Sequence, residues 1–148
     1  MKYLIEKNLK QGFLDAEAQG AKHELNSPGT IIVSDVKIAK LFEIDGNINL
    51  KQCEKIAQEI LCDNVSEDFS FKNVNFTGYK RAEIWLKNSI TDVVGGTVEK
   101  IIKDIFYFDC RVRCGTAYFL KGTFNGEKLK ATMLKTFVNP LIHKFYVK

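Results

Sequence analysis

Cysteine and histidine are the residue types in this chain best suited to hold a soft metal or act as nucleophiles. The 148 residues include four cysteines and two histidines. Cys53 and Cys62 are nine positions apart in a helical pattern, which places them on opposite faces of a helix. Cys110 and Cys114 share one side of a predicted strand but are separated by about 13 Å of strand rise. Neither spacing is typical of a metal site.

Neither cysteine pair forms a CxxC motif, and neither His23 nor His143 is near them in the sequence. We interpret the cysteines as small buried hydrophobic residues in a reducing cytosol. The alternative is a Cys–His nucleophile pair that only the fold brings together, and no local motif supports it. The sequence therefore predicts no catalytic residue, no metal site and no cofactor.

Composition narrows the class of protein further. Lys plus Arg number 22 and Asp plus Glu 18, which gives a net charge of +4, and 45% of the residues are hydrophobic. This balance is typical of a globular chain and excludes a disordered, collagenous or coiled-coil protein. No apolar run approaches the roughly 20 residues that span a bilayer, and charges interrupt the first residues where a signal peptide is apolar. We expect a cytoplasmic protein without membrane contact.

The two halves of the chain carry the same pattern of elements. In the second half, every other residue from Cys110 to Leu120 falls on one face of a predicted long strand. Val36 and Val112 occupy the same phase of their strands and differ by 76 in number. The same difference relates three further pairs: Phe42 and Tyr118, Gly46 and Gly122, and Asn49 and Asn125. Upstream the difference is 77, as for Asp15 and Asp92. The sequence thus predicts an internal repeat.

Each repeat is predicted to run strand, helix, long strand, helix, strand. The first strands are residues 3–9 and 81–86, and Asp15 and Asp92 stand at the N-cap positions of the helices that follow. In the second repeat that helix has apolar residues at helical spacing: Val94, Val98, Ile101, Ile102 and Ile105. Beside Asp92, we interpret the Gly95-Gly96 pair as allowing a close approach of helix and strand.

The predicted fold class is α+β. We expect two tandem βαβ(β)αβ units, residues 1–72 and 80–148 with a linker at 73–79. Each unit would be a small antiparallel or mixed sheet with two helices on one face. Because a unit of about 70 residues is marginally stable alone, we expect the two to form an internal pseudo-dimer.

Short motifs in both repeats resemble the PurS family, the small subunit of phosphoribosylformylglycinamidine synthase. In the first repeat they are residues 10–15 (KQGFLD), 33–40 (VSDVKIAK) and 61–65 (LCDNV). In the second they are residues 87–92 (KNSITD), 112–115 (VRCG) and 137–142 (FVNPLI). The usual family member is one such unit that dimerises, so this chain resembles a tandem, fused form.

The resemblance implies a non-catalytic scaffold in de novo purine biosynthesis. The family's enzyme is a glutamine-dependent, ATP-using ligase, and its small subunit is thought to bridge the synthetase and the glutaminase and to help ammonia pass between them. The implied partners are the large synthetase subunit or domain and the glutaminase, and a homodimer is a further possibility. Such a scaffold needs a rigid frame and complementary charges rather than catalytic groups.

Four residues are candidates for partner binding. Lys37, Arg111 and Arg113 lie on the polar face of the long strands, either as a solvated face or as a contact for an acidic partner or a phosphate. Trp85 is either an interface anchor or part of the junction between the two repeats. Asp15 and Asp92 are interpreted as helix caps rather than catalytic acids.

Two other classes of function remain open. The first alternative is a small-ligand-binding regulatory module, because tandem two-layer α/β units often bind metabolites. The second is a nucleic-acid binder that stacks bases on Phe42, Tyr118 and Phe119, but two of these three occupy the buried phase of a strand. The dispersed lysines give no basic tail, so we expect no nucleic-acid partner.

Overall fold

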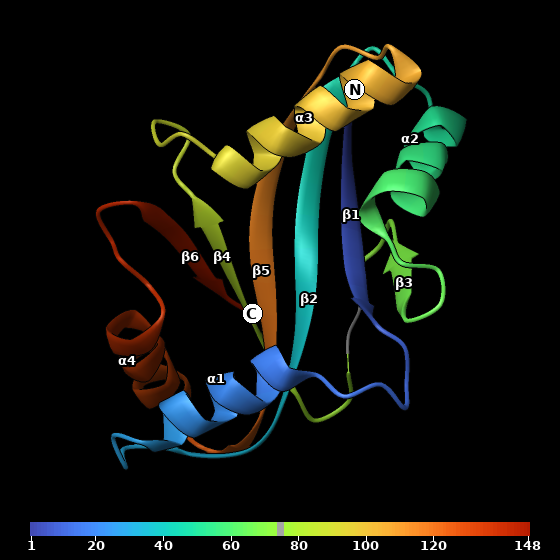
Figure 1. Ribbon diagram of the computed structural model, residues 1–148. Coiled ribbons are helices and arrows are strands. Elements are labelled where there is room, and N and C mark those ends of the chain that lie inside the picture. The colour runs from blue at the N-terminus through green and yellow to red at the C-terminus, as the bar shows by residue number, and fades with distance from the viewer. Residues whose placement is uncertain (74–75) are drawn as a thin grey trace. The chain divides into compact units, whose positions relative to one another are not determined.

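The computed structural model describes residues 1–73 and 76–148, in which the order strand, helix, strand, helix, strand occurs twice (Figure 1). In chain order the elements are β1 (Lys2–Leu9), α1 (Ala16–Asn26), β2 (Ile32–Gly46), α2 (Leu50–Ile56) with the π-helical turn η1 (Ala57–Leu61), β3 (Glu67–Ser70), β4 (Lys80–Leu86), α3 (Val93–Phe106), β5 (Cys110–Thr123), α4 (Gly126–Thr136) and β6 (His143–Val147). The predicted α+β class and the predicted order of elements are confirmed.

The strands are hydrogen-bonded in the order β3-β1-β2-β5-β4-β6. β1 pairs antiparallel with β2, with Ile5 opposite Phe42, and antiparallel with β3 on its other side. β4 pairs antiparallel with β6, with Ile84 opposite Phe145. Each first strand therefore pairs antiparallel with the last strand of its own repeat.

The chain forms two compact units, and each takes segments from both sequence repeats. The first unit comprises residues 1–13, 39–74 and 88–115, and the second comprises residues 14–38, 75–87 and 116–148. The predicted boundaries, 1–72 and 80–148, describe the order of like elements along the chain and remain a prediction, as does the pseudo-dimer. Of the predicted linker 73–79, residues 74 and 75 lie outside the described residues.

The core of the first unit lies between α2, η1 and α3 on one side and strands of the sheet on the other. Val98 and Ile102 of α3 share this core with Ile5 of β1 and Val112 of β5. The other buried members are Phe42, Ile44, Ile48, Cys53, Ile56, Ala57 and Leu61. Both helices thus cover one face of the strands.

The core of the second unit has the same two layers. α1 lies against α4, and Leu25 of α1 and Met133 of α4 are fully buried with Leu120 of β5. The other buried members are Ala18, Ala21, Ile31, Val33, Val36, Ile38, Ala82, Ile84, Leu129 and Val138. Hydrophobic burial of this kind is the main force that holds a helix on a sheet.

Helix caps recur at matching positions of the two repeats. Asp15 accepts the amide hydrogen of Ala18 and caps α1, and Asp92 accepts that of Gly95 and caps α3. Asn49 and Asn125 likewise cap α2 and α4. These residues have short side chains whose oxygens satisfy the unpaired amides of a first helical turn, so the same local signal starts equivalent helices.

The turns before β3 and β6 share one hydrogen-bond pattern. The amide of Asp63 donates to Oε1 of Glu67 at 2.9 Å, and the amide of Asn139 donates to Nδ1 of His143 at 2.9 Å. Both pairs are related by the 76-residue difference seen in the sequence. The ring nitrogen of His143 therefore has a structural role in this turn.

Two equivalent glycines permit close contacts between backbone segments. A Cβ on Gly46 would lie 2.7 Å from the carbonyl oxygen of Asp109 in the first unit. A Cβ on Gly122 would lie 2.0 Å from the carbonyl oxygen of Ile32 in the second unit. A side chain at either position would force the backbone apart, which explains why both positions carry glycine.

Candidate partner-binding surfaces

Arg111 and Arg113, two of the four predicted contact residues, line a groove of about 460 Å³ in the first unit. Both lie on β5. Arg111 is exposed, whereas Nη1 of Arg113 donates a hydrogen bond to the carbonyl oxygen of Ile90 at 3.1 Å. Of the two guanidinium groups, that of Arg111 is therefore the one more available to a partner.

Acidic groups on the wall of this groove bond to backbone amides. Asp92 accepts from Gly95 and Cys114, and Oε1 of Glu99 accepts the amide hydrogen of Val112 at 2.8 Å. These bonds tie α3 to β5 and fix the wall. On the rim, Lys2 forms an ion pair with Glu43 at 3.7 Å. The groove is thus a polar surface on a rigid support.

Lys37 lies in the second unit, whereas Arg111 and Arg113 lie in the first. Its Nζ is 4.5 Å from the ring centroid of Phe76 and 5.7 Å from that of Tyr79. The Tyr79 hydroxyl donates to Oδ2 of Asp35, and this hydrogen bond, with burial, raises the pKa of Tyr79 to about 12. Lys37 therefore belongs to an aromatic cluster, which the strand pattern alone did not indicate.

Trp85, the fourth predicted contact, hydrogen-bonds to a buried carboxylate in the second unit. Its Nε1 donates to Oε1 of Glu83 at 3.0 Å, and Nε of Arg81 and Nζ of Lys148 donate to Oε2 at 2.8 and 3.0 Å. Burial alone would raise the pKa of Glu83, but these three hydrogen bonds outweigh it and hold the pKa below its usual value. The network fixes one edge of the Trp85 ring.

Sequence reasoning missed the network around Glu83. On the strand, Glu83 alternates with apolar residues and has the pattern of a solvent-facing side chain. Its partners Arg81 and Trp85 are two positions before and after it and share its face of the strand. This spacing was the only local indication of the network. The third donor, Lys148, comes from the other end of the repeat and is brought close by the pairing of β4 with β6.

The four thiols have raised pKa values. Burial, as the largest cause, raises the pKa of Cys53 and Cys62 to about 11 and that of Cys114 to about 12, and it also raises the pKa of Cys110. A thiol with such a pKa is protonated at neutral pH and is a weak nucleophile. Cys53 is buried, as interpreted from the sequence, whereas Cys62, Cys110 and Cys114 are partly exposed.

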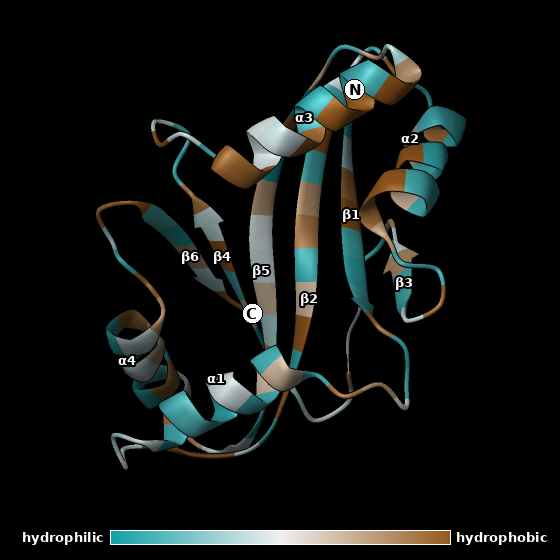
Figure 2. Ribbon diagram, viewed as in Figure 1, coloured by the Kyte–Doolittle hydropathy of each residue, from teal (hydrophilic) through white to brown (hydrophobic). Residues whose placement is uncertain are grey.

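The outer side of α3 carries an apolar strip that we call the α3 strip, made of Val94, Ile101 and Ile105. These residues are 60%, 38% and 55% exposed, whereas Val98 and Ile102 on the same helix are in the core. The helical pattern of the sequence did not separate these two groups. Figure 2 shows brown, hydrophobic residues recurring along α3.

The equivalent helix of the first repeat lacks such a strip. Subtracting 77 from the three numbers gives Glu17, Glu24 and Pro28, and Glu17 and Glu24 are exposed on α1. The two helices begin in the same way, since an aspartate caps each of them. One of two equivalent helices therefore presents apolar side chains to solvent where the other presents charge.

Other kinds of site are not found in the part of the chain that the structure describes. Within residues 1–73 and 76–148, no three His, Cys, Asp or Glu side chains are grouped so that they could hold a metal ion. None of the helices described there has the length and apolar character needed to span a bilayer.

The chain is a two-layer α+β protein whose first unit carries an exposed apolar strip on α3 and a charged groove. Residues 3–75 match the family PurS, described as phosphoribosylformylglycinamidine (FGAM) synthase. The chain is therefore a PurS-like protein that takes part in the FGAM synthase of purine biosynthesis, together with other subunits of that enzyme. A comparison with curated proteins found no match.

Proposed function

We propose that this chain is the non-catalytic assembly component of FGAM synthase, which bridges the synthetase and the glutaminase and assists the transfer of ammonia between them. The observation that carries the proposal is the α3 strip, three exposed apolar side chains on a helix of a PurS-like protein. Exposed apolar patches of this kind are typical of interaction sites, because water leaves them when a partner binds.

The difference between α3 and α1 supports a specific partner rather than general adhesion. Solvent favours charged residues on an exposed helix face, and α1 has Glu17 and Glu24 there. Val94 and Ile101, at the matching positions of α3, contribute favourable hydrophobic free energy only when another apolar surface covers them. We assign the α3 strip to the large synthetase subunit or domain.

Charged groups near α3 would add specificity to this contact. The groove with Arg111 and Arg113 also includes Gly96 and Glu99 of α3, so it adjoins the helix. An acidic group of the partner would pair with the exposed Arg111 guanidinium and fix the orientation of binding. Lys37 and Trp85 remain proposed contacts in the second unit, and a homodimer of the chain remains a proposed additional assembly.

A co-purification experiment tests the assignment. The chain is mixed with the cognate synthetase and glutaminase in the presence of glutamine, ADP and magnesium, and the complex is followed by size-exclusion chromatography. Ile101→Glu introduces at α3 the residue that α1 carries at Glu24, and Glu24→Gln on α1 is the matched control. We expect Ile101→Glu to weaken binding of the synthetase at least tenfold and the control to bind normally.

Two results would contradict the proposal. If the unaltered chain does not co-migrate with either protein, the assembly role is wrong. If Ile101→Glu keeps its circular dichroism spectrum and binds the synthetase as tightly as the unaltered chain, the α3 strip is not the contact surface.

A further inference from the structure

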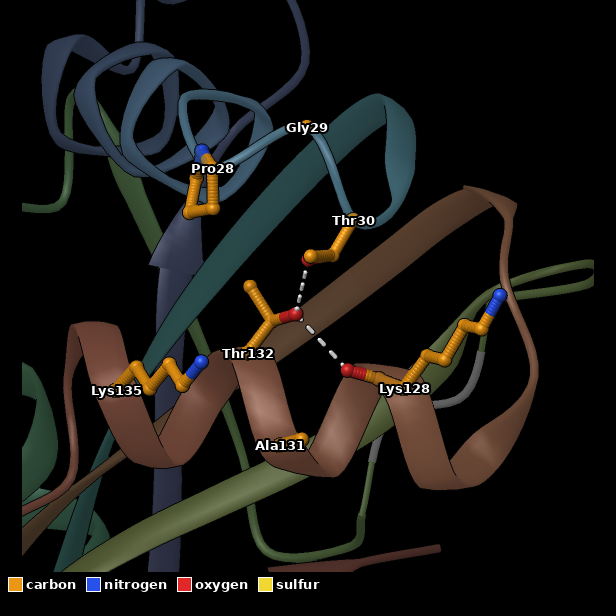
Figure 3. Close-up of a pocket in the computed structure, with 7 residues that line it drawn as sticks. All are labelled: Pro28, Gly29, Thr30, Lys128, Ala131, Thr132 and Lys135. Carbon is orange, nitrogen blue, oxygen red and sulfur yellow. Dashed lines mark hydrogen bonds between the residues drawn. The ribbon is translucent and has the colours of Figure 1, made fainter.

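A pocket of about 350 Å³ lies in the second unit, between the segment that follows α1 and the side of α4 (Figure 3). Its lining residues are Pro28, Gly29, Thr30, Lys128, Ala131, Thr132 and Lys135. A volume of this size is at the lower end of the range for small-molecule sites, which is about 300–1,000 Å³. The pocket is separate from the groove of Arg111 and Arg113, which belongs to the first unit.

The first unit carries a larger side chain at a position that matches the pocket wall. The 76-residue difference relates Ala131 of α4 to Lys55 of α2, and the caps Asn49 and Asn125 start these two helices in the same register. In the first unit, Nζ of Lys55 lies 5.2 Å from the ring centroid of Phe106. A long side chain of one unit is thus represented by a methyl group in the other, which leaves space beside α4.

The charge in the pocket is positive. Lys128 and Lys135 are seven residues apart on α4, and among the described residues the pocket lining includes no carboxylate. Within residues 1–73 and 76–148, neither lysine is engaged in an ion pair. In Figure 3 the amine of Lys135 points toward Thr132, and Lys128 extends on the other side of the pocket. An anion beside Thr132 would meet the Lys135 ammonium group, and Lys128 adds positive charge at the other end of the pocket.

The two threonines determine which hydrogen-bonding group the ligand must carry. The Thr132 hydroxyl donates to the carbonyl oxygen of Lys128 at 2.9 Å, so it has no hydrogen left for Thr30, 3.0 Å away. Thr30 must therefore be the donor of that pair, and its own lone pairs remain able to accept. A ligand hydroxyl could donate to Thr30, while Pro28 and Ala131 would contact its carbon atoms.

We propose that this pocket binds a small hydroxylated organic phosphate. The phosphate group lies beside Lys135, with Lys128 adding positive charge at the other end of the pocket. The carbon chain lies beside Ala131, and a ligand hydroxyl donates to Thr30. The proposal is independent of the assembly role, because none of these residues belongs to the α3 strip or to the groove.

Isothermal calorimetry with glycerol 3-phosphate, inorganic phosphate and glycerol tests the proposal on the whole chain. We expect glycerol 3-phosphate to bind more tightly than inorganic phosphate and glycerol not to bind. At a concentration ten times the Kd it should raise the Tm by about 3–6 °C. Lys135→Ala should weaken binding at least about tenfold, and Lys130→Ala, an exposed lysine of the same helix outside the pocket, should leave it unchanged.

Ala131→Lys separates a shaped site from simple attraction by a basic surface. This variant adds a positive charge but replaces the methyl group in the pocket wall by the long side chain that the first unit carries at Lys55. The proposal predicts that it abolishes binding. Tighter binding by Ala131→Lys, equal binding of inorganic phosphate and the ester, equal losses for Lys130→Ala and Lys135→Ala, or no binding by the unaltered chain would overturn it.

Discussion

Oδ2 of Asp92 accepts the amide hydrogen of Cys114 on β5 at 2.7 Å, while Oδ1 of the same carboxylate caps α3. One side chain therefore fixes both the start of the helix and its attachment to the sheet. Asp15 caps α1 through the amide of Ala18 at 2.9 Å, and this is the only hydrogen bond to the Asp15 carboxylate among the described contacts.

Asp92→Ala is expected to destabilise the protein more than Asp15→Ala. Loss of a cap costs about 1 kcal/mol, and leaving the Cys114 amide without an acceptor adds about 1–3 kcal/mol. Urea unfolding followed by circular dichroism measures both free energies of unfolding. Equal losses for the two variants would show that the bond to Cys114 contributes nothing.

Gly95 and Gly96 are adjacent on α3 but should respond oppositely to alanine. A Cβ on Gly95 would lie 2.2 Å from the carbonyl oxygen of Val112, whereas one on Gly96 would meet nothing within 4 Å. Gly95→Ala should cost about 1–3 kcal/mol through overpacking. Gly96→Ala should stabilise the helix by about 0.5–1 kcal/mol. Thermal unfolding of the two variants, compared side by side, checks the sign of each change.

Glu83 makes stability depend on pH in the acid range. Because its folded-state pKa is lowered, its contribution is fully present above the unfolded pKa, about 4.3, and is lost as the pH falls through the lower folded value. Glu83→Gln should therefore lower the free energy of unfolding at pH 7 by about 2 kcal/mol and flatten its fall below pH 5. Glu43→Gln, which affects an exposed ion pair, should change stability by less than about 1 kcal/mol. A wild-type acid profile in Glu83→Gln would contradict this account.

The cysteines should react slowly with alkylating reagents in the folded protein. A pKa about two units above the usual value of a thiol lowers its thiolate fraction about 100-fold at pH 7. Iodoacetamide labelling followed by mass spectrometry should show this slowing relative to protein unfolded in urea. Rapid labelling of Cys62 in the folded protein would refute the interpretation of the cysteines as inert.

The sequence contained enough information to predict the order and type of the elements. Alternation around Val112, helical spacing around Ile102 and the caps Asp15 and Asp92 are local signals, and local signals survive folding. The 76- and 77-residue differences were inferred because strand and helix residues of the two repeats occupy matching phases. The difference of 76 also relates the turn at Asp63 to the turn at Asn139.

The composition of the two units could not be predicted, because it depends on contacts between distant segments. Nothing local shows that Lys37 packs on Phe76 in one unit while Arg111 lies in the other. The exposure of Ile101 likewise depends on which side of α3 faces the strands, since the adjacent Ile102 is fully buried. The pocket beside α4 required both the fold and the comparison of the repeats.

The assembly role is tested most directly by comparing the ammonia source that the reconstituted enzyme can use. The cognate synthetase and glutaminase are assayed for FGAM formation with and without this chain, first with glutamine and then with ammonium chloride. We predict that omission of the chain abolishes glutamine-dependent formation and leaves ammonium-dependent formation unchanged. Equal glutamine-dependent rates with and without the chain would contradict the central claim.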